Sequence, residues 1–116
     1  MKIDLRSITE KIIQFRDNRG WAQYHDHKNL SQALSIEAAE LQEIFLWKTS
    51  DESRDLNHDE IERVKEELAD IFIYLTYLCH EFKTDLFEEV LRKIEKNAVK
   101  YPIEKSKSSS KKYNEL

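Results

Sequence analysis

The sequence ELADIFIYLTYLC, residues 67–79, decides the fold of this chain. From Ile71 to Cys79 no residue is charged, and apolar side chains recur through the stretch at the three- and four-residue spacing of a helix. Glu67 and Asp70 stand three residues apart immediately before this run, so they lie on the same side of the helix. We therefore predict a largely buried helix that presents two carboxylates at one edge of its buried part.

A second pair of carboxylates, Glu37 and Glu40, has the same spacing on another predicted helix. Glu37 falls inside the apolar arc of that helix, and Glu40 lies at the edge of the arc. A glutamate within an apolar stripe breaks the pattern of a simple amphipathic helix, and such conflicts are expected at functional sites. The apolar residues of the arc are Leu30, Leu34, Leu41, Ile44 and Phe45.

Four main helices are predicted from caps and periodicity. The first follows Ser7, with Glu10 completing a capping box, and ends at Gly20. The others run from about Asn29 to Lys48, from Asn57 (capping box with Glu60) to Lys83, and from Asp85 to the stop at Tyr101-Pro102; the segments 21–28 and 49–56 are predicted loops. The fold class is all-α, a helical bundle completed by oligomerisation because 116 residues bury only a modest core. Residues 1–102 form the predicted domain, and the Ser/Lys-rich residues 103–116 form a predicted disordered tail.

Composition limits the classes of function. The formal net charge is −4, and the basic tail makes the remainder more acidic still, which argues against a nucleic-acid groove. Cys79 is the only cysteine, and the N-terminus has no apolar core of signal-peptide length. The longest charge-free apolar stretch, Ile71 to Cys79, is too short to cross a membrane. We therefore expect a reduced, cytoplasmic environment, without membrane anchoring.

The four carboxylates have two interpretations. They could be solvated helix charges paired with lysines, which is the common explanation for any single pair of this spacing. Alternatively they converge on a metal ion, because like charges gather in a poorly solvated place only around a counter-charge. No Lys or Arg occurs between Asn29 and Trp47, which favours the metal. An all-oxygen ligand set favours Mg²⁺, and the absence of a Glu-x-x-His pattern disfavours a di-iron bundle.

Other polar and aromatic residues are candidates for substrate contacts. Trp21, His25 and Trp47 either pack as rim residues or stack on a nucleobase. Asn29 either caps its helix or binds a base edge or sugar hydroxyl, and Tyr74 lies on the carboxylate flank. The end of the fourth helix offers three further candidates: Asn97, Lys100 and Tyr101. For Lys100 the simpler interpretation is a solvated charge at a helix end.

Together these motifs resemble the MazG-like all-α nucleoside triphosphate pyrophosphohydrolases, in the branch that includes dCTP pyrophosphatases. The resemblance covers residues 20–102. It is carried by an ordered set of motifs: Trp21, His25, Asn29-Leu30, Glu37-Ala-Ala-Glu40-Leu41, Phe45-Leu46-Trp47-Lys48, Glu66-Glu67-Leu68-Ala69-Asp70 with Tyr74, and Lys96-Asn97 with Lys100-Tyr101-Pro102.

The resemblance implies hydrolysis of a (d)NTP to the monophosphate and pyrophosphate with Mg²⁺, for which Mn²⁺ could substitute. It assigns the metal to Glu37, Glu40, Glu67 and Asp70 and implies nucleotide contacts by Trp21, His25, Trp47, Tyr74 and Asn97. It also implies a homo-oligomer, a dimer or tetramer. The substrate expected from it is dCTP or, in a house-cleaning role, a modified nucleotide.

Two alternatives to this enzyme stay open from the sequence. The chain could be a non-catalytic helical module that binds nucleotides or a protein partner, or a di-metal redox bundle containing iron. If it is the enzyme, a water would attack the α-phosphorus, and Glu40 or Glu67 would act as the general base.

Overall fold

Every regular element in the computed structural model, which describes residues 4–107 and residue 110, is a helix. The all-α fold class is thereby confirmed. The four long helices match the four predicted ones: α1 (Leu5–Asn18), α2 (His27–Glu43), α4 (His58–Glu81) and α5 (Leu86–Lys100). By its internal contacts the chain divides into two units, Met1–Lys83 and Thr84–Leu116. The predicted carboxylate pairs both belong to the first unit.

Helix α4 begins as its sequence predicts. The Asn57 side chain accepts a hydrogen bond from the Glu60 backbone N–H, and the Glu60 side chain accepts one from the Asn57 N–H, which completes the capping box. The helix ends at Glu81, two residues before the predicted Lys83. Lys83 has a positive φ of 52°, the left-handed conformation common just after a helix C-cap.

The predicted starts of the first two helices were wrong by about one turn. Helix α1 is capped by Asp4, whose carboxylate accepts from the Arg6 N–H, and Ser7 lies inside the helix. Helix α2 is capped by Asp26, which accepts from the N–H of Asn29. In both cases an aspartate three residues upstream takes the N-cap role for which it competes well with Ser and Asn.

The end of α2 also differs from the prediction. Its regular part stops at Glu43, and residues 44–47 continue in tighter turns that Trp47 closes with a φ of 68°. Lys48 then forms an ion pair with Glu60 of α4, with 2.7 Å between Nζ and Oε2. The predicted loops contain two short helices, η1 (Trp21–Tyr24) and α3 (Ser50–Ser53).

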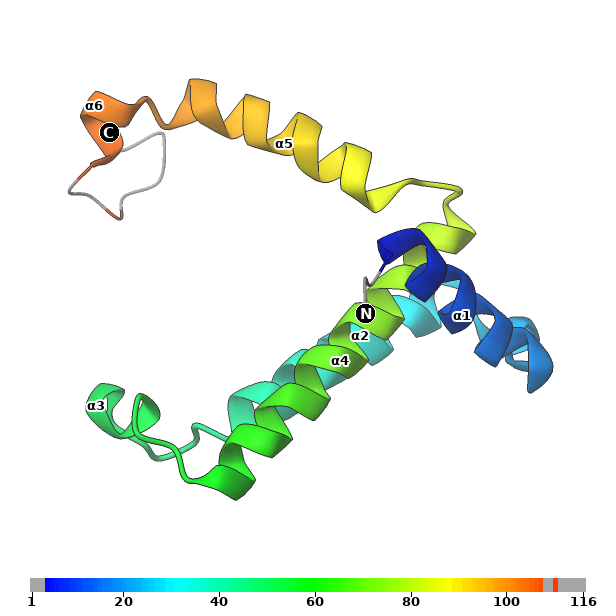
Figure 1. The fold of residues 1–116 in the computed structure, drawn as a ribbon, viewed down its shortest axis with the longest axis horizontal. Helices are drawn as coiled ribbons and strands as arrows, with labels where there is room; N and C mark the ends of the chain where they lie inside the picture. The colour runs from blue at the N-terminus through cyan, green and yellow to red at the C-terminus, as the bar shows by residue number, and fades with distance from the viewer. Residues whose placement is uncertain (1–3, 108–109, 111–116) are drawn as a thin grey trace. The chain divides into compact units, whose positions relative to one another are not determined.

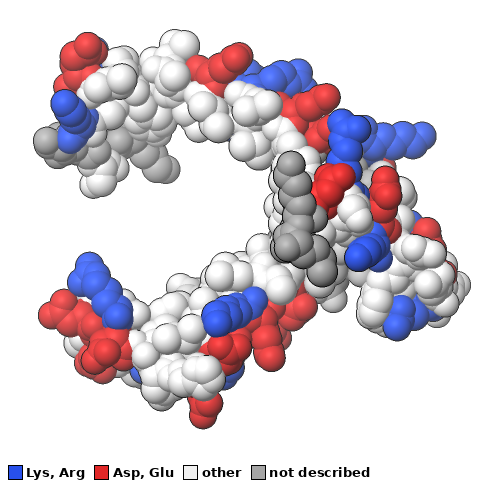
Figure 2. All heavy atoms as spheres, viewed as in Figure 1, with Lys and Arg blue, Asp and Glu red and all other residues white. Residues whose placement is uncertain are grey.

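Helices α2 and α4 lie side by side and form the centre of the first unit (Figure 1). They are antiparallel, because His25 before α2 contacts Tyr77 late in α4, whereas Lys48 after α2 contacts Glu60 early in α4. The most buried apolar side chains, Leu30, Ile44 and Tyr77, come from these helices and the turn after α2. Helix α1 packs on α4 and on η1. On the face drawn in Figure 2, acidic and basic side chains of this unit are mixed.

The second unit consists of α5 and the short helix α6 (Ile103–Ser106). Asp85 caps α5 as predicted, accepting from the N–H groups of Phe87 and Glu88, and the helix ends before Tyr101-Pro102. Helix α6 lies at the start of the tail predicted to be disordered, and residues 108–109 and 111–116 of that tail lie outside the described residues. Among the described helices none is both long and apolar enough to cross a bilayer.

Candidate functional site

Helices α2 and α4 bring three of the four predicted carboxylates together. One oxygen each from Glu37, Glu67 and Asp70 lies within 4.8 Å of the other two. Glu67 and Asp70 meet on one side of α4 because they are three residues apart, and Glu37 faces them from the inner side of α2. All three side chains are half-buried. The convergence predicted from two separate helices is therefore present in the described chain.

Within the part of the chain that the structure describes, this cluster has no ion-pair partner. Burial raises the pKa of Glu37 to about 7, the neighbouring carboxyl groups of Glu67 and Glu40 raise it further, and the charges of Glu40 and Asp70 add to the effect. Among the ion pairs of the described residues, none includes Glu37, Glu67 or Asp70. A carboxyl group with a raised pKa is the expected result when acids crowd together without a cation.

Two oxygen atoms of the cluster are left without any hydrogen-bond partner. Glu37 Oε2 and Glu67 Oε2 are both buried and unpaired in the described chain. Leaving a buried polar oxygen unpaired is unfavourable, which makes such atoms natural ligand positions. The donors are carboxylate oxygens alone, the chemistry that a hard divalent cation such as Mg²⁺ prefers. The residues present therefore fit a divalent cation.

Glu40, the fourth predicted ligand, is not part of the group of three within 4.8 Å. Its half-buried carboxyl group is nevertheless close enough to Glu37 to raise the pKa of that residue. Glu40 therefore lies beside the cluster, where it can act on Glu37 or on a bound water.

Tyr74 lies one turn beyond Asp70 on α4, close to the cluster. Burial raises the pKa of its hydroxyl, and the charges of Glu37, Asp70 and Glu40 raise it further. The phenol is therefore a neutral hydrogen-bond donor at neutral pH. Its ring also meets that of Tyr77 edge to face, with centroids 5.9 Å apart.

His25 lies on the loop between η1 and α2, near the far end of α4. Its ring rests on that of Tyr77, with centroids 4.7 Å apart, and it lines a groove of about 580 Å³ together with Gln23, Asp26 and Glu81. Burial and the charge of Arg16 lower the pKa of His25, against an opposing effect of Glu81. The imidazole is therefore neutral at neutral pH.

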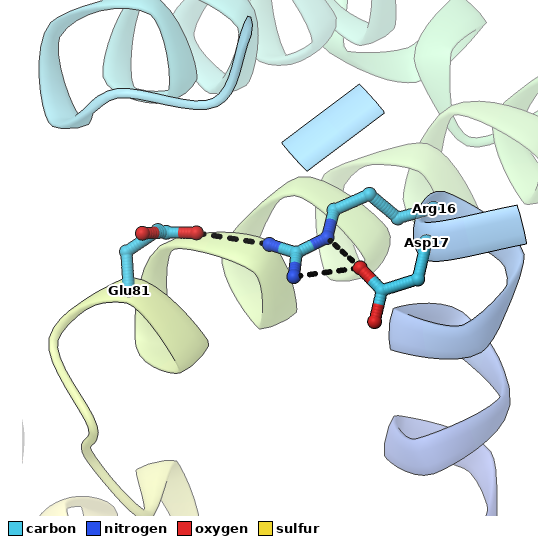
Figure 3. A network of polar contacts seen from close by, with 3 residues as sticks. All are labelled: Arg16, Asp17 and Glu81. Carbon is cyan, nitrogen blue, oxygen red and sulfur yellow. Dashed lines mark hydrogen bonds and ion pairs between the residues drawn. The ribbon is translucent and has the colours of Figure 1, made fainter. Parts of the chain in front are cut away.

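An ion pair that the sequence did not suggest lies beside His25. Arg16 of α1 is 4% exposed, and its Nη1 lies 2.9 Å from Glu81 Oε1 of α4 (Figure 3). The other side of the guanidinium contacts Asp17, with 2.9 Å between Nη2 and Oδ1. The signal was available in part, because Arg16 follows Ile12 by four residues and continues the apolar stripe of α1.

The remaining candidates are placed differently. Trp47 is 91% exposed, and Trp21 packs edge to face on Phe15 with centroids 5.7 Å apart. The Asn29 amide donates to the Tyr24 carbonyl and to Asp26, while the capping role that was one of its two interpretations belongs to Asp26. Three candidates belong to the second unit, Thr84–Leu116, and not to the unit that holds the carboxylates: Asn97, Lys100 and Tyr101.

Fold and site together define an all-α protein with an acidic cluster between two antiparallel helices. Known proteins are similar to it in both sequence and fold. The model of the MazG-like family matches residues 32–116. The dCTP pyrophosphatase 1 of Homo sapiens is 40% identical over 114 residues, which make up 97% of this chain and 67% of that protein. The Mus musculus protein of the same name is 36% identical over the same shares of both chains.

A solved structure shows the same fold. It is a pyrophosphatase from Archaeoglobus fulgidus, 43% identical, with a TM-score of 0.81 over 88% of this chain and 95% of that one. Since the family model matches most of the sequence, the chain belongs to the MazG-like family. The resemblance inferred from the ordered motifs is thereby confirmed.

Proposed function

We propose that the chain hydrolyses a (deoxy)nucleoside triphosphate, with dCTP or a modified nucleotide as the preferred substrate, in a reaction that depends on Mg²⁺. In broader terms the chain is a nucleoside triphosphate pyrophosphohydrolase, as its family and its dCTP pyrophosphatase relatives indicate. The products are then the nucleoside monophosphate and pyrophosphate.

The observation that carries the proposal is the carboxylate cluster without a counter-ion. Glu37, Glu67 and Asp70 converge within 4.8 Å, and two of their oxygens are buried without a partner. These three residues would hold a divalent cation, with Glu40 as a fourth ligand or a neighbour. When bound, the cation supplies positive charge that neutralises the phosphate oxygens of the substrate and its transition state.

The chain's own side chains then bind the substrate and move a proton. Glu40 or Glu67 accepts the proton of the water that attacks the α-phosphorus, because either can remain a free base while the others bind the cation. Tyr74 donates a hydrogen bond from a hydroxyl that stays protonated at neutral pH. The α2–α4 pair keeps these groups at fixed separations, which contributes to catalysis by positioning.

Nucleoside contacts are proposed for the polar and aromatic candidates. Trp21 and Trp47 offer aromatic faces for stacking, and the fully accessible indole of Trp47 supports this role. His25 and Asn29 would contact the nucleoside, although the Asn29 amide already serves the turn before α2. The candidates of the second unit would contact the nucleotide from the end of α5: Asn97, Lys100 and Tyr101.

We also propose that the active form is a homo-oligomer, a dimer or a tetramer. The apolar face of α5 supports this assembly, because its own unit leaves Val90, Leu91 and Ile94 uncovered and the face needs a packing partner. Light scattering coupled to gel filtration tests it. A mass of one chain at micromolar concentration, with full activity, contradicts it.

A substrate panel tests the activity. Pyrophosphate release is measured with Mg²⁺ for the four natural dNTPs, the four NTPs and several base-modified dNTPs, and repeated with EDTA. We expect release from at least one dNTP, highest for a cytosine or modified-cytosine nucleotide, and none with EDTA. Release of orthophosphate instead of pyrophosphate, or equal rates with and without metal, contradicts the proposal.

A further inference from the structure

Three aromatic rings form a row through the first unit. The ring of His25 lies on that of Tyr77, with centroids 4.7 Å apart and planes inclined at 43°. The ring of Tyr77 meets that of Tyr74 edge to face, at 5.9 Å and 82°. Tyr77 is the middle ring and is only 3% exposed, so its surroundings hold it in place.

The two ends of this row have different neighbours. Tyr74 lies in the field of the carboxylates, which raise its pKa. His25 lies on a loop at the other end of α2, near Arg16 and Glu81. Because α4 rises 1.5 Å per residue, Tyr77 stands about 10 Å along the helix from Asp70. The row therefore spans the distance between the carboxylate cluster and the loop.

Little besides Tyr77 orients the His25 ring. His25 Nδ1 is buried and has no hydrogen-bond partner in the described chain, so no bond at this nitrogen fixes the rotation of the imidazole. The backbone of His25 is held at the C-cap of η1, where its N–H donates to the Ala22 carbonyl, but that bond leaves the rotation of the side chain open. Stacking on a buried aromatic ring is consequently the contact that sets where the imidazole points.

We propose that Tyr77 is a positioning residue, which fixes the orientation of His25 relative to Tyr74 and the carboxylate cluster and so aligns the nucleoside with the triphosphate. The proposal rests on the proposed function, in which His25 and Tyr74 contact the nucleotide. Tyr77 itself does not touch the substrate; it acts through the two rings beside it.

The chain offers a matched control on the same helix. His27, two residues after His25, stacks on Phe82 with centroids 4.1 Å apart and planes at 24°. Phe82 is 58% exposed and lies at the end of α4, farther from Asp70 than Tyr77 is. Replacing Phe82, the C-cap of α4, by Leu removes a ring from beneath the histidine that begins α2, and Phe82 is not one of the three rings of the row.

The experiment is a double-mutant cycle on kcat/KM. Tyr77→Leu is made in the native chain and in the His25→Ala variant, alongside Tyr77→Phe and Phe82→Leu. We expect Tyr77→Leu to lower kcat/KM about tenfold in the native chain, because small misplacements of substrate contacts are costly, and less than twofold when His25 is already absent. Tyr77→Phe, which keeps the ring, and Phe82→Leu should each change it less than twofold.

Two kinetic outcomes overturn the proposal. An equal loss from Tyr77→Leu in both backgrounds means that the residue does not act through His25. A loss from Phe82→Leu as large as that from Tyr77→Leu means that any ring removed from α4 has the same effect. Circular dichroism verifies folding of each variant, and Tyr77→Met replaces the leucine variant if the latter does not fold.

A spectroscopic readout separates this proposal from the proposed function. The Cε1–H proton of His25, assigned with the His25→Ala variant, should carry a ring-current shift in the native chain and in Tyr77→Phe that disappears in Tyr77→Leu. If the native chain releases no pyrophosphate from any dNTP, the proposed function fails, and this shift still decides the positioning role. A resonance that Tyr77→Leu leaves unchanged overturns that role.

Discussion

Helix α4 presents acidic side chains to neighbouring helices at two places. A basic side chain pairs with the acid at one place and not at the other. Near its C-terminal end, Glu81 accepts a hydrogen bond from the buried guanidinium of Arg16, which belongs to α1. Near its middle, Glu67 and Asp70 face another acid, Glu37, and no described cation pairs with them. One helix thus carries a neutralised acid and an unneutralised acidic group.

The difference separates structural charge from functional charge. A partly buried acid that serves the fold has its counter-ion within the chain, because an unpaired charge is unfavourable. In an acidic group that binds a ligand, the ligand supplies the positive charge. Without the ligand, the like charges of the group repel one another. The pKa of Glu37 is raised by burial and by the neighbouring acids, and binding of a divalent cation would favour the charged form again.

The largest effect is expected from removing a ligand of the acidic cluster. Asp70→Asn should lower kcat on the best dNTP at least about a thousandfold, because the charge of a metal ligand is lost from the reacting centre. The same variant should melt at an equal or higher temperature than the native chain in EDTA, since one like charge is gone. Pyrophosphate release and thermal melting measure the two effects, and near-native turnover would show that Asp70 is not a ligand.

At the C-terminal end of α4, where Arg16 pairs with Glu81, a substitution is expected to lower stability more than turnover. Arg16→Met leaves Glu81 partly buried without its cation and should lower the free energy of unfolding by about 3 kcal/mol. Urea unfolding measures this. Turnover at a temperature where the variant is folded should fall far less than in Asp70→Asn. Arg16→Met combined with Glu81→Leu should recover part of the stability, and failure to recover any would mean that the guanidinium acts by packing alone.

A smaller effect should appear as a pH dependence of stability without metal. The folded chain holds the proton of Glu37 more tightly than the unfolded chain does, because its pKa is raised from 4.5 to about 7. The contribution of this group to the free energy of unfolding therefore decreases as the pH rises from 4.5 to 7. Unfolding in EDTA across this range should show the decrease, and Glu37→Gln should lessen it.

The pH dependence of Mg²⁺ binding tests the same carboxyl group, Glu37, in a second way. Because the proton must leave Glu37 before the oxygen can bind a cation, the apparent affinity for Mg²⁺ should increase as the pH rises toward 7. Calorimetric titration at several pH values measures it. An affinity that is independent of pH would indicate that Glu37 is not among the ligands.

The smallest effect is expected from the ion pair at the other end of α2. Lys48 lowers the pKa of Glu60 through a side-chain hydrogen bond, assisted by the Asn57 backbone N–H. The stability from this contact is therefore fully present above the unfolded-state pKa of Glu60 and is lost as the pH falls through the lower pKa of the folded chain. Lys48→Met should lower the melting temperature slightly at pH 7 and less at pH 3. Equal decreases at both pH values would assign the effect to the lysine stem.

Local patterns predicted the helices, and competition among nearby caps explains the errors. The capping box of Asn57 and Glu60 was predicted correctly because both partners lie within one turn. Ser7 with Glu10 has the same pattern, yet Asp4 caps α1, and Asp26 takes the position predicted for Asn29. A single sequence shows which residues can cap a helix but not which of two neighbours does so.

The site was predictable in part for a related reason. The spacing of Glu67 and Asp70, and the place of Glu37 within an apolar arc, indicated which carboxylates turn inward. The ion pair of Arg16 with Glu81 joins residues 65 positions apart and depends on how α1 packs on α4. The row from His25 through Tyr77 depends likewise on the antiparallel pairing of α2 and α4. Such contacts follow from tertiary packing, which local periodicity does not encode.

Trp47 has a consequence for anyone who engineers this chain. Its backbone is left-handed, with a φ of 68°, and its indole is 91% exposed, so the residue is held in a conformation that costs about 1 kcal/mol and buries almost nothing in return. Glycine or asparagine would adopt the same backbone with less strain. A selection for heat tolerance alone would therefore replace Trp47 early. A variant library should also be screened for turnover if the indole is to be kept.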